Sequence, residues 1–329
     1  MKTFLKYALA GTMLLGSVIV GQAQTTIRVT LQLPVTHSLG QNWIAFKNII
    51  EKESGGDLKL ELFPSAQLYK DKQVPEAVGS GAIEAGSAFL GRFAGSVPAV
   101  EIVNLPFFFR DEAQLRAAAA NGSPMRNILD AAVVKETGAK VLWWQAFGRN
   151  VYLNKGKPIR VPADLKGKKV RTYGKVLGWT VEALGGAPTI MSGSKQFLAY
   201  QQGAVDVGMT GASAVKSRKL YEVMENMTLS YDSAIEFVAV MNNDFFNSLS
   251  KKNQDIITKA AATVEKQLRD QVYGAEAAVV KEVADKINVV TLTKEERAQW
   301  VDATKSVVEK FAAERGEVAV QAIKAANGL

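Results

Sequence analysis

Three arginines stand at the ends of apolar runs, and they are the residues best suited to bind a ligand. Arg92 follows "AFLG", Arg149 follows "WWQAFG", and Arg171 lies in "KKVRTYG". Parallel sheets bind ligands at the carboxyl ends of their strands. A guanidinium there offers a carboxylate two parallel charge-assisted hydrogen bonds. The alternative is that each arginine pairs with an internal Asp or Glu, because burying it unpaired costs several kcal/mol.

Residue types that catalysis or metal binding needs are scarce. The chain has no cysteine and one histidine, His37, which is expected at a helix start or on the surface. Ser194 lacks the G-x-S-x-G pattern, and His/Cys metal sites lack ligands. EF-hand, Walker A and G-x-G-x-x-G patterns are absent from the sequence. We therefore expect no catalytic residue, metal or cofactor, while paired carboxylates stay open.

The N-terminus predicts export. Two lysines precede an apolar run over residues 7–20, and Gly21 and Ala23 fit the −3 and −1 positions of a cleavage site. The run is short for a membrane anchor, which needs about 20 apolar residues. We predict a signal peptide over residues 1–23, cleaved near Ala23, and a periplasmic protein.

Composition sets further bounds. Of the 329 residues, 47% are hydrophobic and 22% charged, which is typical of a globular chain long enough for two domains. The net charge of +8 comes from lysines and arginines spread along the chain. This pattern argues against nucleic acid as a partner and is compatible with attraction of anions.

Strand-like and helix-like segments alternate, which predicts an α/β fold with mixed, largely parallel sheets. Residues 154–167, which are basic and contain two prolines, predict a crossing between domains. The clearest segments are strands at 25–33, 57–63, 139–147 and 168–173 and helices at 112–135, 250–286 and 294–315.

Three ordered motifs carry a resemblance to a known family. They are "FKNIIEKESGGDLKLELFPSAQLYKDKQVPEAVGSGAIEAGSAFLGRFAGSVPAVEIVNLPFFFRD", "KPIRVPADLKGKKVRTYG" and "FLAYQQGAVDVGMTG". The chain resembles the DctP-like substrate-binding proteins of tripartite ATP-independent periplasmic (TRAP) transporters over essentially its whole mature length. The resemblance implies a two-domain Venus-flytrap fold with a ligand cleft and a long helix spanning both domains. The implied domains are 24–148 with 236–275 and 149–235 with 276–329.

The resemblance also implies which residues face the cleft. Arg171 occupies the position of the arginine that pairs with the ligand carboxylate. Arg149 falls where some members carry a second ligand-facing arginine. Arg92 and Phe89 fall on a first-domain loop facing the cleft.

Two departures from the family pattern affect the expected pocket. Met209 and Thr210 replace a Glu-Asn pair, and Gly193 replaces a frequent aromatic residue. Both changes remove bulk and predict a roomier or differently shaped pocket. They favour a ligand larger than a four-carbon acid, whereas the arginines favour a dicarboxylate or polar acid.

Four more residues are candidates for ligand contact. Gln32 and Trp144 lie near strand ends of the first domain, although Trp144 also fits a core position. Asp232 and Glu236 lie in "SYDSAIEF", where family members vary their specificity residues. The alternative for these two acids is a solvated surface position.

The resemblance implies a periplasmic solute-binding protein that captures a small organic acid by domain closure. Its expected partners are the small and large membrane subunits of a TRAP permease, and a monomer is expected. Two alternatives stay open. One is an exported lyase or isomerase with Asp or Glu as its base, and the other is the ligand-binding subunit of a sensor system.

Overall fold

The computed structural model describes residues 24–328, and the predicted signal peptide lies outside them. Over that span, none of the helices combines the length and apolar character needed to cross a membrane. The strands are β1 (Thr25–Leu31), β2 (Leu58–Phe63), β3 (Ala85–Phe89), β4 (Ala139–Asn154), β5 (Lys169–Thr172), β6 (Ala187–Ile190), β7 (Val207–Gly211), β8 (Asn226–Leu229), β9 (Ala234–Asn242) and β10 (Asn288–Thr291).

Helices cover the sheet, and two 3₁₀ segments, η2 (Leu90–Gly95) and η3 (Pro98–Asn104), follow β3. The α-helices are α1 (Ser38–Glu53), α2 (Val74–Gly79), α3 (Glu112–Ala118), α4 (Pro124–Thr137), α5 (Lys175–Ala183), α6 (Gln196–Gln201), α7 (Ala212–Ser217), α8 (Asn243–Ser248), α9 (Lys251–Val283), α10 (Lys294–Glu314) and α11 (Gly316–Asn327).

The described strands form one mixed sheet, as expected from the sequence. Its order is β2-β1-β3-β9-β4-β7-β5-β6, with β8 and β10 added beside β4. Parallel pairing holds within the two outer parts, whereas every antiparallel pair within residues 24–328 includes β4 or β9. The two central strands therefore join two α/β halves.

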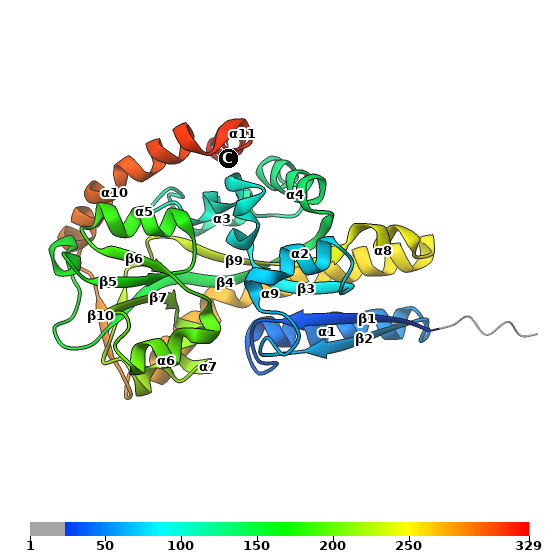
Figure 1. Ribbon diagram of the computed structural model, residues 1–329, viewed down its shortest axis with the longest axis horizontal. Coiled ribbons are helices and arrows are strands. Elements are labelled where there is room, and N and C mark those ends of the chain that lie inside the picture. The colour runs from blue at the N-terminus through cyan, green and yellow to red at the C-terminus, as the bar shows by residue number, and fades with distance from the viewer. Residues whose placement is uncertain (1–23, 329) are drawn as a thin grey trace, which may run out of the picture.

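The two halves form separate lobes, which Figure 1 shows on opposite sides of the crossing strands. The first lobe contains β1–β3, α1, α2, α4 and α8, and the second contains β5–β8, β10 and α5–α7. Helix α9 has 33 residues and is about 50 Å long at 1.5 Å per residue. Its Ile257 and Val264 pack in the first lobe and its Val283 in the second, so the predicted spanning helix is confirmed.

The crossing between the lobes lies earlier than the composition of residues 154–167 predicted. Strand β4 pairs with β9 up to Arg149 and with β7 and β8 beyond it. Residues 154–167 form a loop of the second lobe instead, where Ile159 and Leu165 are buried. The prolines of residues 154–167 indicate a loop with turns. The chain passes from one lobe to the other within the continuous strand β4, where the composition does not change.

Two helices stand where the sequence predicted one over 112–135. Helix α3 ends at Ala118, and Gly122 then adopts a φ of 80°. Ser123 caps α4 by accepting a hydrogen bond from the amide of Arg126, and Pro124 occupies the first turn. Proline at that position starts a helix but cannot continue one, which explains the break.

The C-terminal helix α11 was not expected beyond the helical pattern at 294–315. The chain turns between α10 and α11 at Arg315 and at Gly316, the first residue of α11, which has a φ of 77°. Its buried Ala319, Ala322 and Ala326 pack against the first lobe near α4 and η3. Figure 1 shows α10 and α11 arching from the second lobe back to the first.

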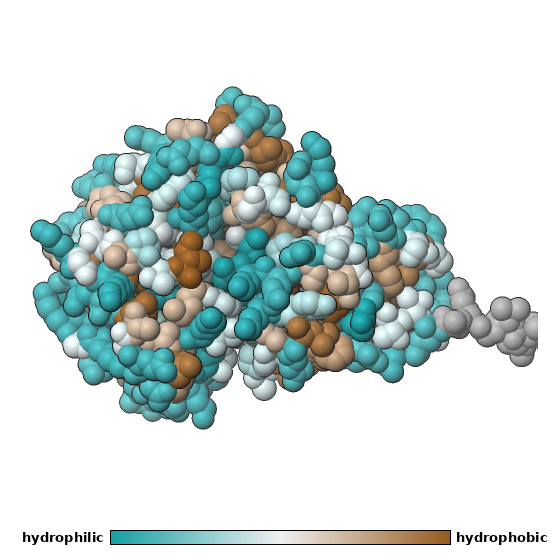
Figure 2. All heavy atoms as spheres, viewed as in Figure 1, coloured by the Kyte–Doolittle hydropathy of each residue, from teal (hydrophilic) through white to brown (hydrophobic). Residues whose placement is uncertain are grey.

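The outer surface gives little sign of a large apolar patch. On the face in Figure 2, hydrophilic residues predominate and hydrophobic ones form small separate groups. The described large hydrophobic side chains that are exposed are Leu68, Ile190 and Leu198. Isolated exposed apolar residues of this kind are normal on a water-facing surface.

Candidate functional site

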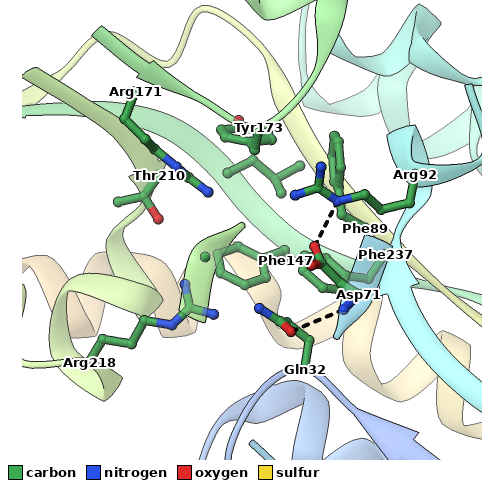
Figure 3. Close-up of a pocket in the computed structure, with 12 residues that line it drawn as sticks. Gln32, Asp71, Phe89, Arg92, Phe147, Arg171, Tyr173, Thr210, Arg218 and Phe237 are labelled. Atoms are coloured by element: carbon green, nitrogen blue, oxygen red, sulfur yellow. Dashed lines mark hydrogen bonds and ion pairs between the residues drawn. The ribbon is translucent and has the colours of Figure 1, made fainter. Parts of the chain in front are cut away.

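A cavity between the two lobes gathers most of the predicted site residues. The space between its walls, which is continuous with the solvent, amounts to about 360 Å³. Figure 3 shows side chains converging on it from both lobes and from the crossing strands. Its walls are made by Gln32, Asp71, Phe89, Arg92, Phe147, Arg171, Tyr173, Gly193, Thr210, Arg218, Ile235 and Phe237.

Arg171 on β5 is buried, with 3% of its surface exposed, and backbone carbonyls hold it in place. Its Nε and Nη2 donate to the carbonyl of Met191 at 3.1 and 2.7 Å, and its Nη1 donates to the carbonyl of Met209. These carbonyls take three of the five N–H groups of the arginine, and the Tyr200 hydroxyl is a further hydrogen-bonding neighbour. A charged guanidinium that lines a cavity can donate charge-assisted hydrogen bonds to the oxygens of a carboxylate.

No described Asp or Glu forms an ion pair with Arg171. Burial lowers the pKa of its guanidinium, and the charge of Arg92 acts in the same direction. The ring of Tyr173 lies 5.3 Å from the guanidinium and offers a weak cation–π contact. The carbonyls and this ring orient the arginine, but they do not neutralise it.

Arg92 on η2 has an internal acid as its partner. Its Nε donates to Asp71 at 2.8 Å, and both side chains are largely buried. The other oxygen of Asp71 accepts a 2.6 Å hydrogen bond from Ser192 of the second lobe. Gln32 of the first lobe also donates to the Ser192 hydroxyl, at 3.3 Å. These contacts join the lobes, so the described state is a closed one.

Arg218, which follows α7, is a pocket residue that the sequence reasoning missed. Its Nη1 donates to the side-chain oxygen of Gln196 at 2.7 Å. Burial and the charge of Arg171 lower the pKa of Arg218 to about 10, so the guanidinium stays charged at neutral pH. It lies in "AVKSRKLY", which has no strand-end pattern to single it out.

Gly193 explains how Arg218 reaches the cavity. A Cβ atom at position 193 would lie 2.5 Å from Nη1 and 2.8 Å from Nη2 of Arg218. Such distances are shorter than side-chain contacts allow, so a larger residue would displace the guanidinium. The bulk that glycine removes is therefore taken up by Arg218 and does not simply enlarge the pocket.

Comparison with known proteins identifies the family. Residues 31–315 match the bacterial extracellular solute-binding protein family 7, DctP. The chain belongs to this family. It is 28% identical over 296 residues to the C4-dicarboxylate-binding periplasmic protein DctP of Rhodobacter capsulatus, covering 88% of this chain and 86% of that protein.

Solved structures of TRAP periplasmic solute-binding proteins share the fold. One from Sulfurospirillum deleyianum, with bound succinate, has a TM-score of 0.83 and 25% identity and covers 92% of this chain and 98% of its own. One from Roseobacter denitrificans, with bound β-D-glucuronate, has the same TM-score and identity and covers 92% and 99%. The two-domain α/β fold of a TRAP solute-binding protein is thereby confirmed.

Two predicted site residues of this DctP-family protein form ion pairs outside the cavity. Arg149 donates through Nε to Glu276 at 2.7 Å, and its guanidinium lies 3.6 Å from the ring centre of Tyr231. Glu236 accepts two hydrogen bonds from Arg269, at 2.8 and 3.0 Å. Internal partners satisfy both charges, and both side chains lie on the strand face opposite Ile235 and Phe237 of the cavity.

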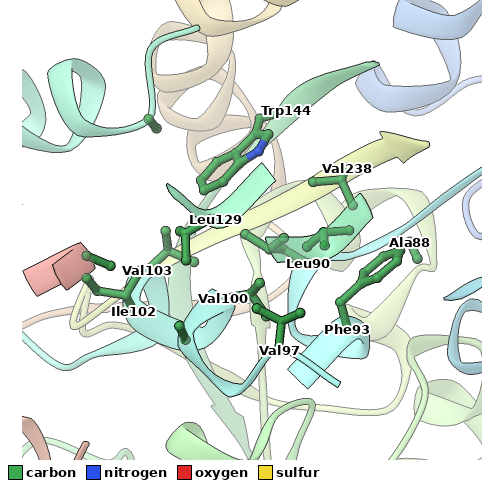
Figure 4. Packing of buried hydrophobic residues seen from close by; sticks show 14 of the residues in the cluster. Ala88, Leu90, Phe93, Val97, Val100, Ile102, Val103, Leu129, Trp144 and Val238 are labelled. Atoms are coloured by element: carbon green, nitrogen blue, oxygen red, sulfur yellow. The ribbon is translucent and has the colours of Figure 1, made fainter. Parts of the chain in front are cut away.

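Two other predicted residues also lie away from the cavity. Asp232 is buried and accepts hydrogen bonds from Ser230 at 2.6 Å and Asn150 at 2.9 Å. Burial raises the pKa of the Asp232 carboxyl. Trp144 is fully buried in the apolar cluster of Figure 4, with its indole N–H donating to Asp130. Asp232 is therefore not a solvated surface residue, and Trp144 occupies a core position.

His37 starts helix α1, and it is buried, not on the surface. Its Nδ1 accepts from the amide of Leu39, and its ring stacks on Phe147 with 5.0 Å between centres. Only 3% of the residue is exposed, and burial, with the charge of Arg218, lowers the pKa of its imidazole to about 3. It is therefore neutral in the closed form at neutral pH.

Within residues 24–328, no three acidic or histidine side chains gather in a way that could hold a metal ion. The described lining of the cavity contains one carboxylate, Asp71, which Arg92 and Ser192 already engage. What the cavity offers chemically is hydrogen-bond donors and positive charge.

Proposed function

We propose that this solute-binding protein captures a small organic acid in the cavity between its lobes, with Arg171 as the residue that binds the carboxylate. The observation that carries the proposal is the buried Arg171 guanidinium, which lines the cavity, is held by backbone carbonyls and has no acidic partner among the described residues. The relatives support the ligand class, since one is named for C4-dicarboxylates and two hold succinate and glucuronate.

Closure of the lobes is the proposed way in which the acid is retained. An acid that contacts both lobes stabilises the closed form over the open form. Closure also removes water from the cavity, which strengthens the attraction between guanidinium and carboxylate. The contact from Ser192 to Asp71 adds a direct bond between the lobes in the closed form.

We propose that the two moving lobes have the bounds of the predicted domains, except for the C-terminal helix α11. The family resemblance implied that residues 276–329 belong to the second domain. Because α11 packs against α4 and η3, we place it with the first lobe. Helix α10, which packs on α5, then connects the lobes alongside β4, β9 and α9.

Delivery of the acid to a TRAP permease in the cytoplasmic membrane, from the periplasm, completes the proposal. Family membership supports it. The test is uptake of radiolabelled ligand into proteoliposomes that contain the membrane subunits, with and without the purified protein. Uptake should require the protein, and ligand recovered from it should be chemically unchanged, as expected of a binding protein and not of an enzyme.

The acid-binding role is tested by substituting Arg171. A thermal-shift panel of mono-, di-, keto-, aromatic and sugar acids first finds ligands of the wild-type protein. Arg171→Gln should then weaken their binding by roughly a hundredfold or more, because hydrogen bonds to a charged group contribute about 1.5–3 kcal/mol each. Calorimetric titration measures the loss.

The matched control is Arg160→Gln, which removes a half-exposed arginine paired with Glu296 on the second lobe. It should leave affinity unchanged. Equal binding by Arg171→Gln and wild type, or the absence of any stabilising acid in the panel, would contradict the proposed function.

A further inference from the structure

The cavity holds more positive charge than one carboxylate can balance. Three guanidinium groups, those of Arg92, Arg171 and Arg218, point into it from three sides (Figure 3). The one carboxylate in the described lining belongs to Asp71, and it pairs with Arg92. Two charged guanidinium groups, on Arg171 and Arg218, therefore have no counterion of their own among residues 24–328.

Arg218 is held in place by a chain of hydrogen bonds that runs through Gln196. Its partner Gln196 is fully buried and accepts the bond through its side-chain oxygen. The amide nitrogen of Gln196 in turn donates to the hydroxyl of Tyr200 at 3.1 Å and the carbonyl of Met209 at 3.4 Å. These bonds fix which way the amide faces, so its oxygen is directed at Arg218.

The same hydrogen-bond chain contacts both Arg171 and Arg218. The carbonyl of Met209 accepts from Arg171 and from Gln196, which in turn accepts from Arg218. Both guanidinium groups are thus oriented by neutral acceptors that leave their charges intact. Like charges held close together in a partly dry site repel each other, and a ligand with matching negative charge relieves the repulsion.

We propose that Arg218 is a second anion-binding residue, that Gly193 is required for it, and that the ligand is a dicarboxylate. One carboxylate binds Arg171 and the other binds Arg218. This inference rests on the proposed function, and it names the ligand class and a specificity-determining residue of the same site. A sugar acid with a single carboxylate would leave the charge of Arg218 unbalanced.

The test compares acids that differ by one charge. Calorimetric titrations use the dicarboxylates from malonate to adipate, each with its monomethyl ester, and glucuronate as a single-carboxylate sugar acid. The wild-type protein should bind its best dicarboxylate at least about thirtyfold tighter than the corresponding ester, since a charge-assisted hydrogen bond contributes about 2 kcal/mol.

Two variants address the residue assignment. Arg218→Gln should reduce the preference for diacid over ester to below about threefold while leaving ester affinity nearly unchanged. Gly193→Ala should act in the same direction, because its methyl group occupies the space of the guanidinium. Circular dichroism checks that both fold, and Arg160→Gln again serves as the control.

Three results would overturn the inference while leaving acid binding by Arg171 intact. They are an ester bound as tightly as its diacid, glucuronate bound tighter than every dicarboxylate, and equal losses for diacid and ester in Arg218→Gln. If the wild-type protein binds none of these acids and no other acid of the panel, the proposed function itself fails, and the inference with it.

Discussion

The partner of each arginine decides what that arginine does. Arg149 has a carboxylate partner in Glu276, and its charge is used within the structure. Arg171 has carbonyl partners, which satisfy N–H groups without cancelling charge. A guanidinium of the second kind is available to an acid ligand, and one of the first kind is not.

His37 makes a prediction about pH at the residue scale. Its pKa is about 3 in the folded chain against an ordinary value of 6.5. Between these values the unfolded chain binds a proton that the folded chain does not, so stability falls as the pH drops from about 6.5. At pH 5 the loss should be about 2 kcal/mol, since one pKa unit corresponds to about 1.4 kcal/mol.

Denaturant unfolding between pH 5 and 7.5 measures this effect. His37→Asn is the control, because asparagine also caps helices and does not titrate. The wild-type stability should rise with pH more steeply than that of the variant. Parallel pH profiles for the two proteins would rule out His37 as the titrating group.

At the scale of elements, Glu101 ties η3 to the second lobe. The carboxylate is fully buried and accepts from the amides of Lys175 at 2.6 Å and Val176 at 3.2 Å, at the start of α5. Its other oxygen accepts from Arg315, between α10 and α11, at 2.9 Å. A negative charge is favourable at a helix N-terminus, so one side chain holds three elements together.

Removing this carboxylate should therefore be costly. Glu101→Ala should lower the free energy of unfolding by about 3 kcal/mol, because it leaves a buried arginine unpaired. Arg315→Met, which keeps packing on Trp179, allows a double-mutant cycle by urea denaturation. The double variant should lose clearly less than the sum of the single losses, and additive losses would show that the pair is not coupled.

At the scale of the whole molecule, closure depends on bonds that exist only when the lobes meet. The hydroxyl of Ser192 is one such group, since Asp71 and Gln32 bind it from the opposite lobe. Loss of these bonds destabilises the closed form without touching the hinge strands. Ligand affinity falls in proportion to the population of the closed form.

Ser192→Ala should weaken ligand binding by roughly three- to tenfold, which corresponds to about 1 kcal/mol for a hydrogen bond. Calorimetry measures affinity, and small-angle scattering measures how far the ligand compacts the molecule. Ser248→Ala, on the exposed surface of α8, is the control. Unchanged affinity and compaction in Ser192→Ala would mean that the hydroxyl does not hold the lobes together.

Local pattern determined a large part of this protein. Alternation and helical periodicity predicted the α/β class, the long helix over 250–286 and most elements, because those depend on neighbouring residues. The ordered motifs also indicated the family and Arg171. The same local pattern explains why the sequence predicts a single helix over 112–135. Gly122 and Pro124 interrupt the helical pattern only briefly, so it does not reveal the break between α3 and α4.

Tertiary structure alone decided the rest. Ion pairs depend on which residues are close in space, so the sequence did not show that Arg149 pairs with Glu276 or that Glu236 pairs with Arg269. It also did not settle that Trp144 lies in the core. Arg218 reaches the cavity only because Gly193, 25 positions earlier in the chain, leaves room for its guanidinium. The space available to a side chain and the balance of its charge depend on residues that are far apart in the chain. Those residues come together only when the chain folds.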